Sequence, residues 1–372
     1  MKNLVFGFVK KYTITFVCIV LFAAVMVFDI EKLGNVYTAN FNNNLLVEIS
    51  MLVGGLIEST FLFTILFDVY KYKLPNVIRD NAIVRRLSVL LISIGLYLII
   101  RAISAIYVGF GTGYLTYYTS TIFLSLIYFC IVSDKEMDMA DYMQKVFINM
   151  LILLIVMLVV MAGTGILFYI VTVLFKYNDF TKLMDLMIIE SVVIGYVGMF
   201  IAIENVDRES GAFEKILIKY VMCIMVLMGF AFFYIYLVRI IINRELPSNE
   251  VFGVCTLLFA IGLFIALMAR SFDEDKVYDK IIKFLPVAFI PALILQGLSL
   301  FLRIGQYGLT TIRYLGFVFL LVELAYVILY ILNYKKLKYI FIIIAVLAFI
   351  ASYIPFINAY QFPAFYNSHF IP

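Results

Sequence analysis

The stretch VFINMLILLIVMLVVMAGTGILFYIVTVLF, residues 146–175, runs for thirty residues without a charged side chain. The hydrocarbon core of a bilayer is about 30 Å thick, so about 20 apolar residues are enough for a helix to cross it. The stretch therefore predicts a transmembrane helix. Its extra length allows that helix to tilt, or to kink at Gly163-Thr164-Gly165.

The whole chain shares this apolar character. Of its 372 residues, 65% are hydrophobic and 14% are charged, and the mean hydropathy is +1.08. In a soluble globular protein about half of the residues are apolar and about a quarter are charged, so that class is excluded. We expect an all-α, polytopic helical bundle in a lipid bilayer, forming a single transmembrane domain over residues 1–372.

Short polar links divide the chain into eleven apolar runs, each long enough for one transmembrane helix. The predicted spans are Tyr12–Phe28, Ile49–Tyr70, Leu87–Val108, Tyr114–Val132, Val146–Phe175, Leu186–Ala202, Ile216–Ile242, Phe252–Met268, Phe284–Leu302, Tyr314–Leu332 and Tyr339–Phe356.

Lysine and arginine mark the side of the membrane on which each link lies, because loops that face the cytoplasm carry an excess of both. With the N-terminus inside, the inner segments hold nineteen of these residues and the outer segments hold six. The predicted orientation is N-terminus inside and C-terminus outside. Abundant Phe, Ile, Tyr, Asn and Lys without tryptophan suggest an AT-rich genome, so we expect the cytoplasmic membrane of a bacterium.

A short motif suggests an internal repeat. The tripeptide Ile57-Glu58-Ser59 recurs as Ile189-Glu190-Ser191, and this offset places residues 12–132 over residues 146–268. Two parallel copies of four helices each would suit a transporter fold. The alternative is coincidence, because three matching residues arise easily in an apolar chain.

Two carboxylates fall near the predicted midplane of the membrane. Glu58 and Glu323 each lie nine residues from the outer end of a span, about 13 Å down a helix. A charged group at that depth costs about 2.5–3.5 kcal/mol on insertion scales, so such residues mark function or interior pairs.

Several arginines lie toward the predicted outer side, where lysine and arginine are otherwise scarce. Arg101 lies in the outer third of its span, Arg303 and Arg313 flank an outer link, and Glu190 lies in the outer part of the sixth span. One interpretation is an outward-facing vestibule in which guanidinium groups bind an anion such as a phosphate or a lipid headgroup. The other is snorkelling and helix–helix pairing with no ligand.

Signatures of catalysis are absent from the sequence. The sole histidine, His369, lies in a short C-terminal tail that we expect to be mobile, and there is no Walker loop or GxSxG elbow. The four cysteines lie in apolar runs without a CxxC. We expect no catalytic residues, no cofactor and no metal site, and no basic arm predicts a nucleic-acid partner.

One family resemblance is carried by RIGQYGLTTIRY, residues 303–314, with support from FFYIYLVRIIINRELPSNE, residues 232–250, and YIPFINAY, residues 353–360. Over residues 212–360 the chain resembles a bacterial family of multi-pass membrane proteins known as domain of unknown function 4153. The matching positions of the first motif are Arg303, Ile304, Tyr307, Gly308, Leu309, Thr310, Arg313 and Tyr314.

Two departures from the family accompany the resemblance. Leu246 replaces a tryptophan that is common before the family's proline, and the polar segment after the last span is only a short tail here. The resemblance implies a helical integral membrane protein and supplies no reaction. It adds Tyr307 to the candidate ligand-binding residues.

Three functions fit these observations. The first is a transport or permease-like role for an anionic or lipid-related ligand, which the midplane carboxylates favour. The second is a membrane scaffold or envelope sensor that acts through a membrane or cytoplasmic partner protein. The third is an enzyme that acts on a lipid-linked substrate, although the lack of catalytic signatures favours a protein that is not an enzyme.

Overall fold

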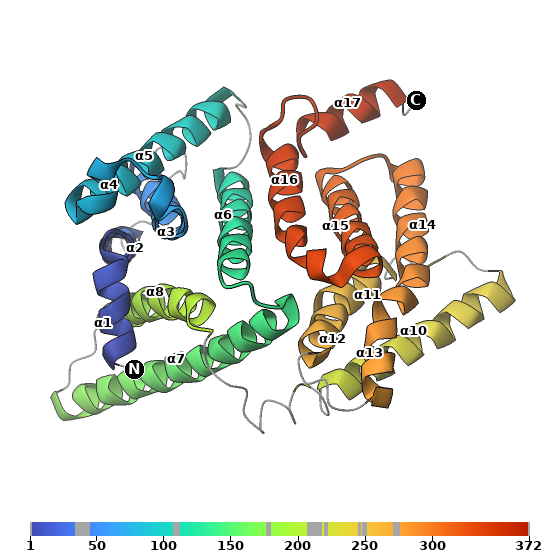
Figure 1. The fold of residues 1–372 in the computed structure, drawn as a ribbon, viewed down its shortest axis with the longest axis horizontal. Coiled ribbons are helices and arrows are strands. Elements are labelled where there is room, and N and C mark those ends of the chain that lie inside the picture. Colours follow the sequence, from blue (N-terminus) through green and yellow to red (C-terminus); the bar gives the residue numbers. More distant parts are fainter. Residues whose placement is uncertain are drawn as a thin grey trace. The chain divides into compact units, whose positions relative to one another are not determined.

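The structure is a computed structural model that describes residues 2–33, 45–106, 112–175, 180–206, 222–244, 251–270 and 276–370, with Ile218 and Pro247. All regular secondary structure within these ranges is helical (Figure 1). The predicted all-α fold class is therefore confirmed.

Eight helices among the described residues are long and apolar enough to cross a membrane, or nine when the bent pair at the N-terminus counts as one span. This confirms a multi-pass membrane protein. Each of the eleven predicted runs overlaps a helix, whereas the count of eleven and the orientation remain predictions.

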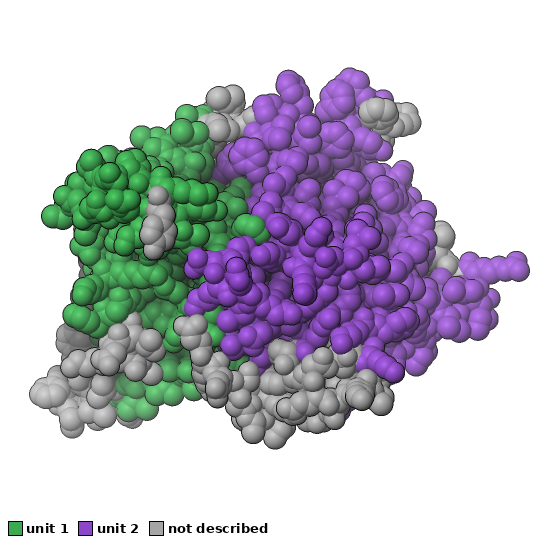
Figure 2. All heavy atoms as spheres, in the orientation of Figure 1, with its two compact units in different colours: residues 1–131, 146–206 green, residues 132–145, 207–372 purple. Residues whose placement is uncertain are grey.

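The chain divides into two compact units, shown in different colours in Figure 2. Unit 1 consists of residues 1–131 and 146–206, and unit 2 of residues 132–145 and 207–372. The single transmembrane domain and the internal repeat remain predictions.

The first helices of the chain are α1 (Lys2–Lys11), α2 (Thr13–Leu33), α3 (Leu45–Val69), η1 (Lys71–Lys73), α4 (Asn76–Asp80), α5 (Ala82–Ile106), α6 (Thr112–Asp134), α7 (Met139–Phe175) and α8 (Phe180–Glu204). In unit 1, α2 packs against α3 and α8, and α3 packs against α5.

Aromatic rings form the centre of unit 1. Phe61 of α3 stacks on Phe200 of α8 with ring centroids 4.0 Å apart, and Tyr12 lies 4.6 Å from Phe61. All three side chains are fully buried. Tyr12 also marks a bend of 103° between α1 and α2, which the apolar pattern did not predict.

The remaining helices are α10 (Cys223–Asn243), α11 (Val251–Leu257), the π-helical η3 (Leu258–Leu263), α12 (Phe264–Ala269), α13 (Lys276–Ala288), α14 (Ile290–Tyr307), α15 (Thr311–Asn333), η5 (Tyr334–Tyr339), α16 (Ile340–Tyr353) and α17 (Gln361–Phe370). In unit 2, α14, α15 and α16 lie side by side (Figure 1), and α11 packs against α14.

Gly316 shows how closely two helices of unit 2 approach each other. A Cβ atom at Gly316 of α15 would lie 2.9 Å from the ring of Phe252 in α11, so the absence of a side chain lets these helices meet.

The ninth apolar run is divided at Phe289 between α13 and α14, with Pro286 before the break and Pro291 after it. Near this break the Tyr234 hydroxyl donates to the Ala288 carbonyl at 2.7 Å.

The stretch from Arg303 to Arg313 is mostly helix with a tight turn at residues 308–310. Gly308 ends α14 with a φ of 76°, a left-handed conformation that glycine adopts without steric cost. The Arg313 guanidinium donates from Nη1 to the carbonyls of Tyr307 at 3.0 Å and Gly308 at 2.6 Å. The turn therefore satisfies carbonyls at the end of α14 within its own sequence.

The segment that holds His369 forms the helix α17, Gln361–Phe370, which the sequence analysis did not predict. Asn367 pairs twice with Leu309: its Oδ1 accepts from the Leu309 N–H and its Nδ2 donates to the Leu309 carbonyl, both at 2.8 Å. Tyr314 and Phe362 add a ring contact of 5.8 Å between centroids. These contacts attach α17 to the turn between α14 and α15.

The predicted orientation places the end of α14 outside and η5 inside. We expect a Gln306→Cys variant to react with a membrane-impermeant thiol reagent on intact spheroplasts, because Gln306 is exposed. A Lys336→Cys variant, at an exposed position in η5, should react only after lysis. The opposite pattern would invert the topology, and the parent protein gives the background from the four native cysteines.

The double contact of Asn367 predicts a measurable contribution to stability. Asn367→Ala removes two hydrogen bonds, each worth about 0.5–1.5 kcal/mol net, so the melting temperature in detergent should fall by a few degrees. Ser368→Ala on the same helix serves as the control, because its hydroxyl contacts only residues of α17. Equal melting temperatures for the two variants would contradict the proposed attachment of α17.

Candidate functional site

Glu323 of α15 is the most deeply buried carboxylate in the described part of unit 2, with no exposed surface. The side-chain amide of Gln296 in α14 donates to its Oε1 at 3.2 Å and to Thr256 Oγ1 of α11 at 3.0 Å. Gln296 is also fully buried. Three helices thus bring a carboxylate, an amide and a hydroxyl together in an apolar interior.

This group of three, the Glu323 site, is not fully hydrogen-bonded. Glu323 Oε2 and Gln296 Oε1 are both buried and have no hydrogen-bond partner among the described residues. An unpaired buried polar atom costs about 1–3 kcal/mol, and more when it is charged. The site is therefore chemically suited to take up a proton or a cation, either of which satisfies these oxygens.

The surroundings of the Glu323 site are irregular and aromatic. The π-helical segment η3 follows α11 directly, and its Phe259 contacts Tyr326 edge-on at 5.4 Å and Phe289 at 5.7 Å between ring centroids. π-helical turns inside α-helices occur frequently at functional sites. Tyr326 and Phe259 each follow a residue of the Glu323 site by three positions on its helix, Glu323 and Thr256 respectively.

A cluster of tyrosines extends along α15 from the Glu323 site. Tyr326 and Tyr330 follow Glu323 at helical spacing, and Tyr334 comes one turn later at the start of η5. Arg270 lies 3.5 Å above the Tyr334 ring and donates to the Tyr330 hydroxyl at 3.2 Å.

This cluster ends at a carboxylate of another segment of unit 2. The Tyr334 hydroxyl donates to Asp138 Oδ1 at 2.7 Å, and Asp138 lies just before α7. These contacts fix the positions of the end of α12, the start of η5 and the start of α7 relative to one another.

Glu58 of α3, the second predicted midplane carboxylate, is 7% exposed and belongs to unit 1. The Ser120 hydroxyl of α6 hydrogen-bonds to it. Glu58 and Glu323 are thus two separate sites within their own units, each with a hydrogen-bond donor from a neighbouring helix.

The predicted outer residues have different surroundings. Tyr307 is 68% exposed, its ring lies 5.5 Å from the Arg313 guanidinium, and Arg303 is half-buried in α14. Glu190 accepts a hydrogen bond from the Thr164 hydroxyl and joins α8 to α7. Arg101 lies in α5, but its side chain is outside the described residues. Ligand binding by these residues remains a prediction.

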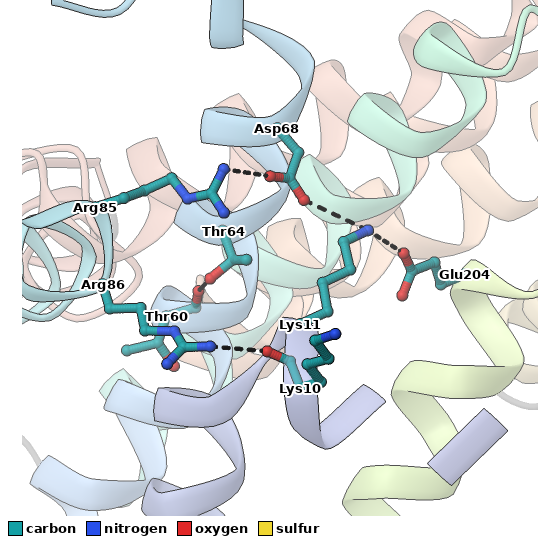
Figure 3. Close-up of polar contacts among 8 residues, drawn as sticks. All are labelled: Lys10, Lys11, Thr60, Thr64, Asp68, Arg85, Arg86 and Glu204. Carbon is teal, nitrogen blue, oxygen red and sulfur yellow. Dashed lines mark hydrogen bonds and ion pairs between the residues drawn. The ribbon is translucent and has the colours of Figure 1, made fainter. Parts of the chain in front are cut away.

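A third polar group, which the sequence analysis did not single out, lies where helix ends meet in unit 1 (Figure 3). We call it the basic cavity. It comprises a hollow of about 70 Å³ lined by Lys10, Lys11, Thr13, Ile14, Thr64, Phe67, Asp68, Arg85, Arg86 and Val89. The end of α1, the start of α2, the end of α3 and the start of α5 converge there.

Ion pairs organise one side of the basic cavity (Figure 3). Asp68 lies 3.5 Å from Lys11 Nζ and 3.5 Å from an Arg85 nitrogen, and Lys11 also pairs with Glu204 at the end of α8. The charge bias assigns all these helix ends to the inner side of the membrane. The doublets Lys10-Lys11 and Arg85-Arg86 are among the nineteen basic residues of the predicted inner segments, but the sequence does not show which helix ends meet.

A family model described as Domain of unknown function (DUF4153) matches residues 59–369. The match includes the region 212–360 that carries the sequence resemblance, and it extends through most of unit 1. It also includes Glu323, Gln296 and the basic positions of α5. No match was found among curated proteins or among solved structures.

Proposed function

The chain belongs to the family described as Domain of unknown function (DUF4153), and because this family supplies no reaction, we propose a function from the site itself. The proposed function is transport of an anionic or lipid-related ligand across the cytoplasmic membrane of a bacterium. One observation carries this proposal: Glu323 is a fully buried carboxylate with an unpaired oxygen in the interior of a multi-helix membrane unit.

The energetic cost of Glu323 argues for a functional role. Ionisable residues inside membrane proteins are rare, and they mark proton relays, ion sites and substrate paths. Glu323 Oε2 is buried and has no hydrogen-bond partner in the described part of the chain, so it is open to a proton or a cation. A carboxyl that binds and releases a proton or cation during a transport cycle accounts for the unpaired oxygen.

The helices around Glu323 have the irregularities that a transport cycle needs. η3 interrupts one span with a π-helical segment, and the break at Phe289 divides the next between α13 and α14. Transporters commonly form their binding sites from discontinuous helices near the midplane. η3 begins two residues after Thr256, and the break at Phe289 comes seven residues before Gln296. Thr256 and Gln296 contact each other at the Glu323 site.

The nature of the ligand follows from the cationic residues. We keep the sequence-predicted residues Arg101, Arg303, Arg313, Tyr307, Glu58 and Glu190 as candidate ligand-binding residues. Arg313 supports this assignment, because its two bonds to carbonyls use Nη1 alone. Its other nitrogens make no hydrogen bond within the described residues. They are therefore available to bind an anionic group of a ligand.

Purified protein in proteoliposomes tests the proposal. The vesicles are loaded with the acidic small-molecule fraction of the bacterial host, and mass spectrometry follows which compounds leave. We expect at least one anionic compound to cross faster than in protein-free vesicles. Glu323→Gln, which cannot lose a proton, should reduce that flux about tenfold or more, and Glu323→Asp should retain part of it.

The matched control is Glu136→Gln, an exposed carboxylate between α6 and α7 whose loss should leave flux unchanged. Wild-type flux in a correctly folded Glu323→Gln variant would remove Glu323 from the transport cycle. Flux no faster than in protein-free vesicles would favour the scaffold or sensor role, in which the chain acts through a partner protein.

A further inference from the structure

At the bend between α1 and α2, the first residues of α2 line the basic cavity. α2 begins at Thr13 and runs for 21 residues, and Thr13 and Ile14 both line the cavity. The first N–H groups of a helix lack partners within it, and they carry a partial positive charge. The Thr13 hydroxyl donates back to the Val9 carbonyl at 2.9 Å, across the bend between the two helices.

The cationic side chains of the cavity fall into two pairs. Lys11 and Arg85 both pair with Asp68, and Lys11 also pairs with Glu204, so two carboxylates balance these two cations within the protein. Lys10 and Arg86 are different, because neither forms an ion pair with a described carboxylate. Arg86 donates from one nitrogen to the Lys10 carbonyl at 3.0 Å, and this bond fixes the two residues side by side (Figure 3).

Lys10 and Arg86 therefore offer unused donors toward the cavity. The Lys10 ammonium makes no hydrogen bond or ion pair within the described ranges, and the remaining nitrogens of Arg86 make none either. Both side chains are exposed, so a ligand reaches them without a change in the fold. Together with the start of α2, they form a positively charged recess with space for a small anion.

The other walls of the cavity indicate where the anion comes from. Phe67, Val89 and Ile14 lie on the sides of the membrane-spanning helices α3, α5 and α2. The recess therefore combines cations at the ends of these helices with an apolar boundary toward their middles. This is the level at which the phosphates of membrane lipids lie, next to their acyl chains.

We propose that the basic cavity binds a phosphate group, with Lys10, Arg86 and the first N–H groups of α2 as its donors. Lysine, arginine and helix starts are the groups with which proteins recognise phosphate. The phosphate comes either from the headgroup of an anionic phospholipid or from a soluble phosphate compound. The site is independent of transport, because it uses other residues than the Glu323 site.

The double variant Lys10→Gln/Arg86→Gln tests the site, since it removes the two unused cations and leaves the Asp68 ion pairs intact. The full chain in neutral detergent is equilibrated with phosphatidylglycerol or phosphatidylcholine, and native mass spectrometry counts the lipids retained. We expect wild-type protein to retain phosphatidylglycerol selectively. The double variant should bind it roughly tenfold more weakly.

The control variant Lys336→Gln/Lys338→Gln removes two positive charges from η5 and should bind phosphatidylglycerol like the wild type. Arg86→Lys keeps the charge and should retain most of the affinity, which separates loss of the site from loss of the fold.

A thermal shift with inorganic pyrophosphate distinguishes the sources. Stabilisation of the wild type but not of the double variant, without lipid selectivity, identifies a soluble phosphate compound as the ligand. The proposal is wrong if the double variant binds phosphatidylglycerol and pyrophosphate as the wild type does, or if the wild type binds neither. Either result leaves the transport assay on Glu323 unaffected.

Discussion

A polar group in the interior of a bilayer has no water to bond with, and this constraint governs the whole fold. It explains why the regular structure is helical throughout the described residues, since a helix satisfies its own backbone. It also explains the polar side chains that serve helix ends, such as Asn149 of α7, which donates to the carbonyls of Ala202 and Asn205 at 3.2 and 2.9 Å. Against this background Glu323 Oε2 belongs to a small set of buried polar atoms without a hydrogen-bond partner among the described residues, and each such atom costs free energy.

Hydrophobic runs predicted the helices well, because the length of an apolar segment depends on the bilayer and not on its neighbours in the fold. The interruptions were not predictable in the same way. The bend at Tyr12 and the π-helical segment η3 depend on how rings such as Phe61 and Phe259 pack in three dimensions. The candidate site had the same limit: Glu323 was recognisable by its depth, but Gln296 and Thr256 became relevant only when three helices brought them together.

Arginine and lysine in this chain have roles that one sequence rule cannot separate. The charge bias treats them alike as markers of the inner side. In the structure, Arg270 lies over the ring of Tyr334, Arg313 closes the end of α14, and Arg86 bonds to the Lys10 carbonyl. Each role depends on the atoms within reach of the guanidinium, so the same residue type positions a helix in one place and leaves donors for an anion in another. The motif with Arg303 and Arg313 thus contributes to structure whatever it binds.

The reciprocal bonding between Asn367 and Leu309 has a consequence for biosynthesis. The turn after α14 is translated before Asn367. The backbone N–H and carbonyl of Leu309 therefore lack this hydrogen-bond partner until residue 367 has been synthesised. The turn between α14 and α15 gains these two bonds only after α17 has been translated. A chain that stops short of α17 therefore leaves the N–H and the carbonyl of Leu309 without the partner that Asn367 supplies.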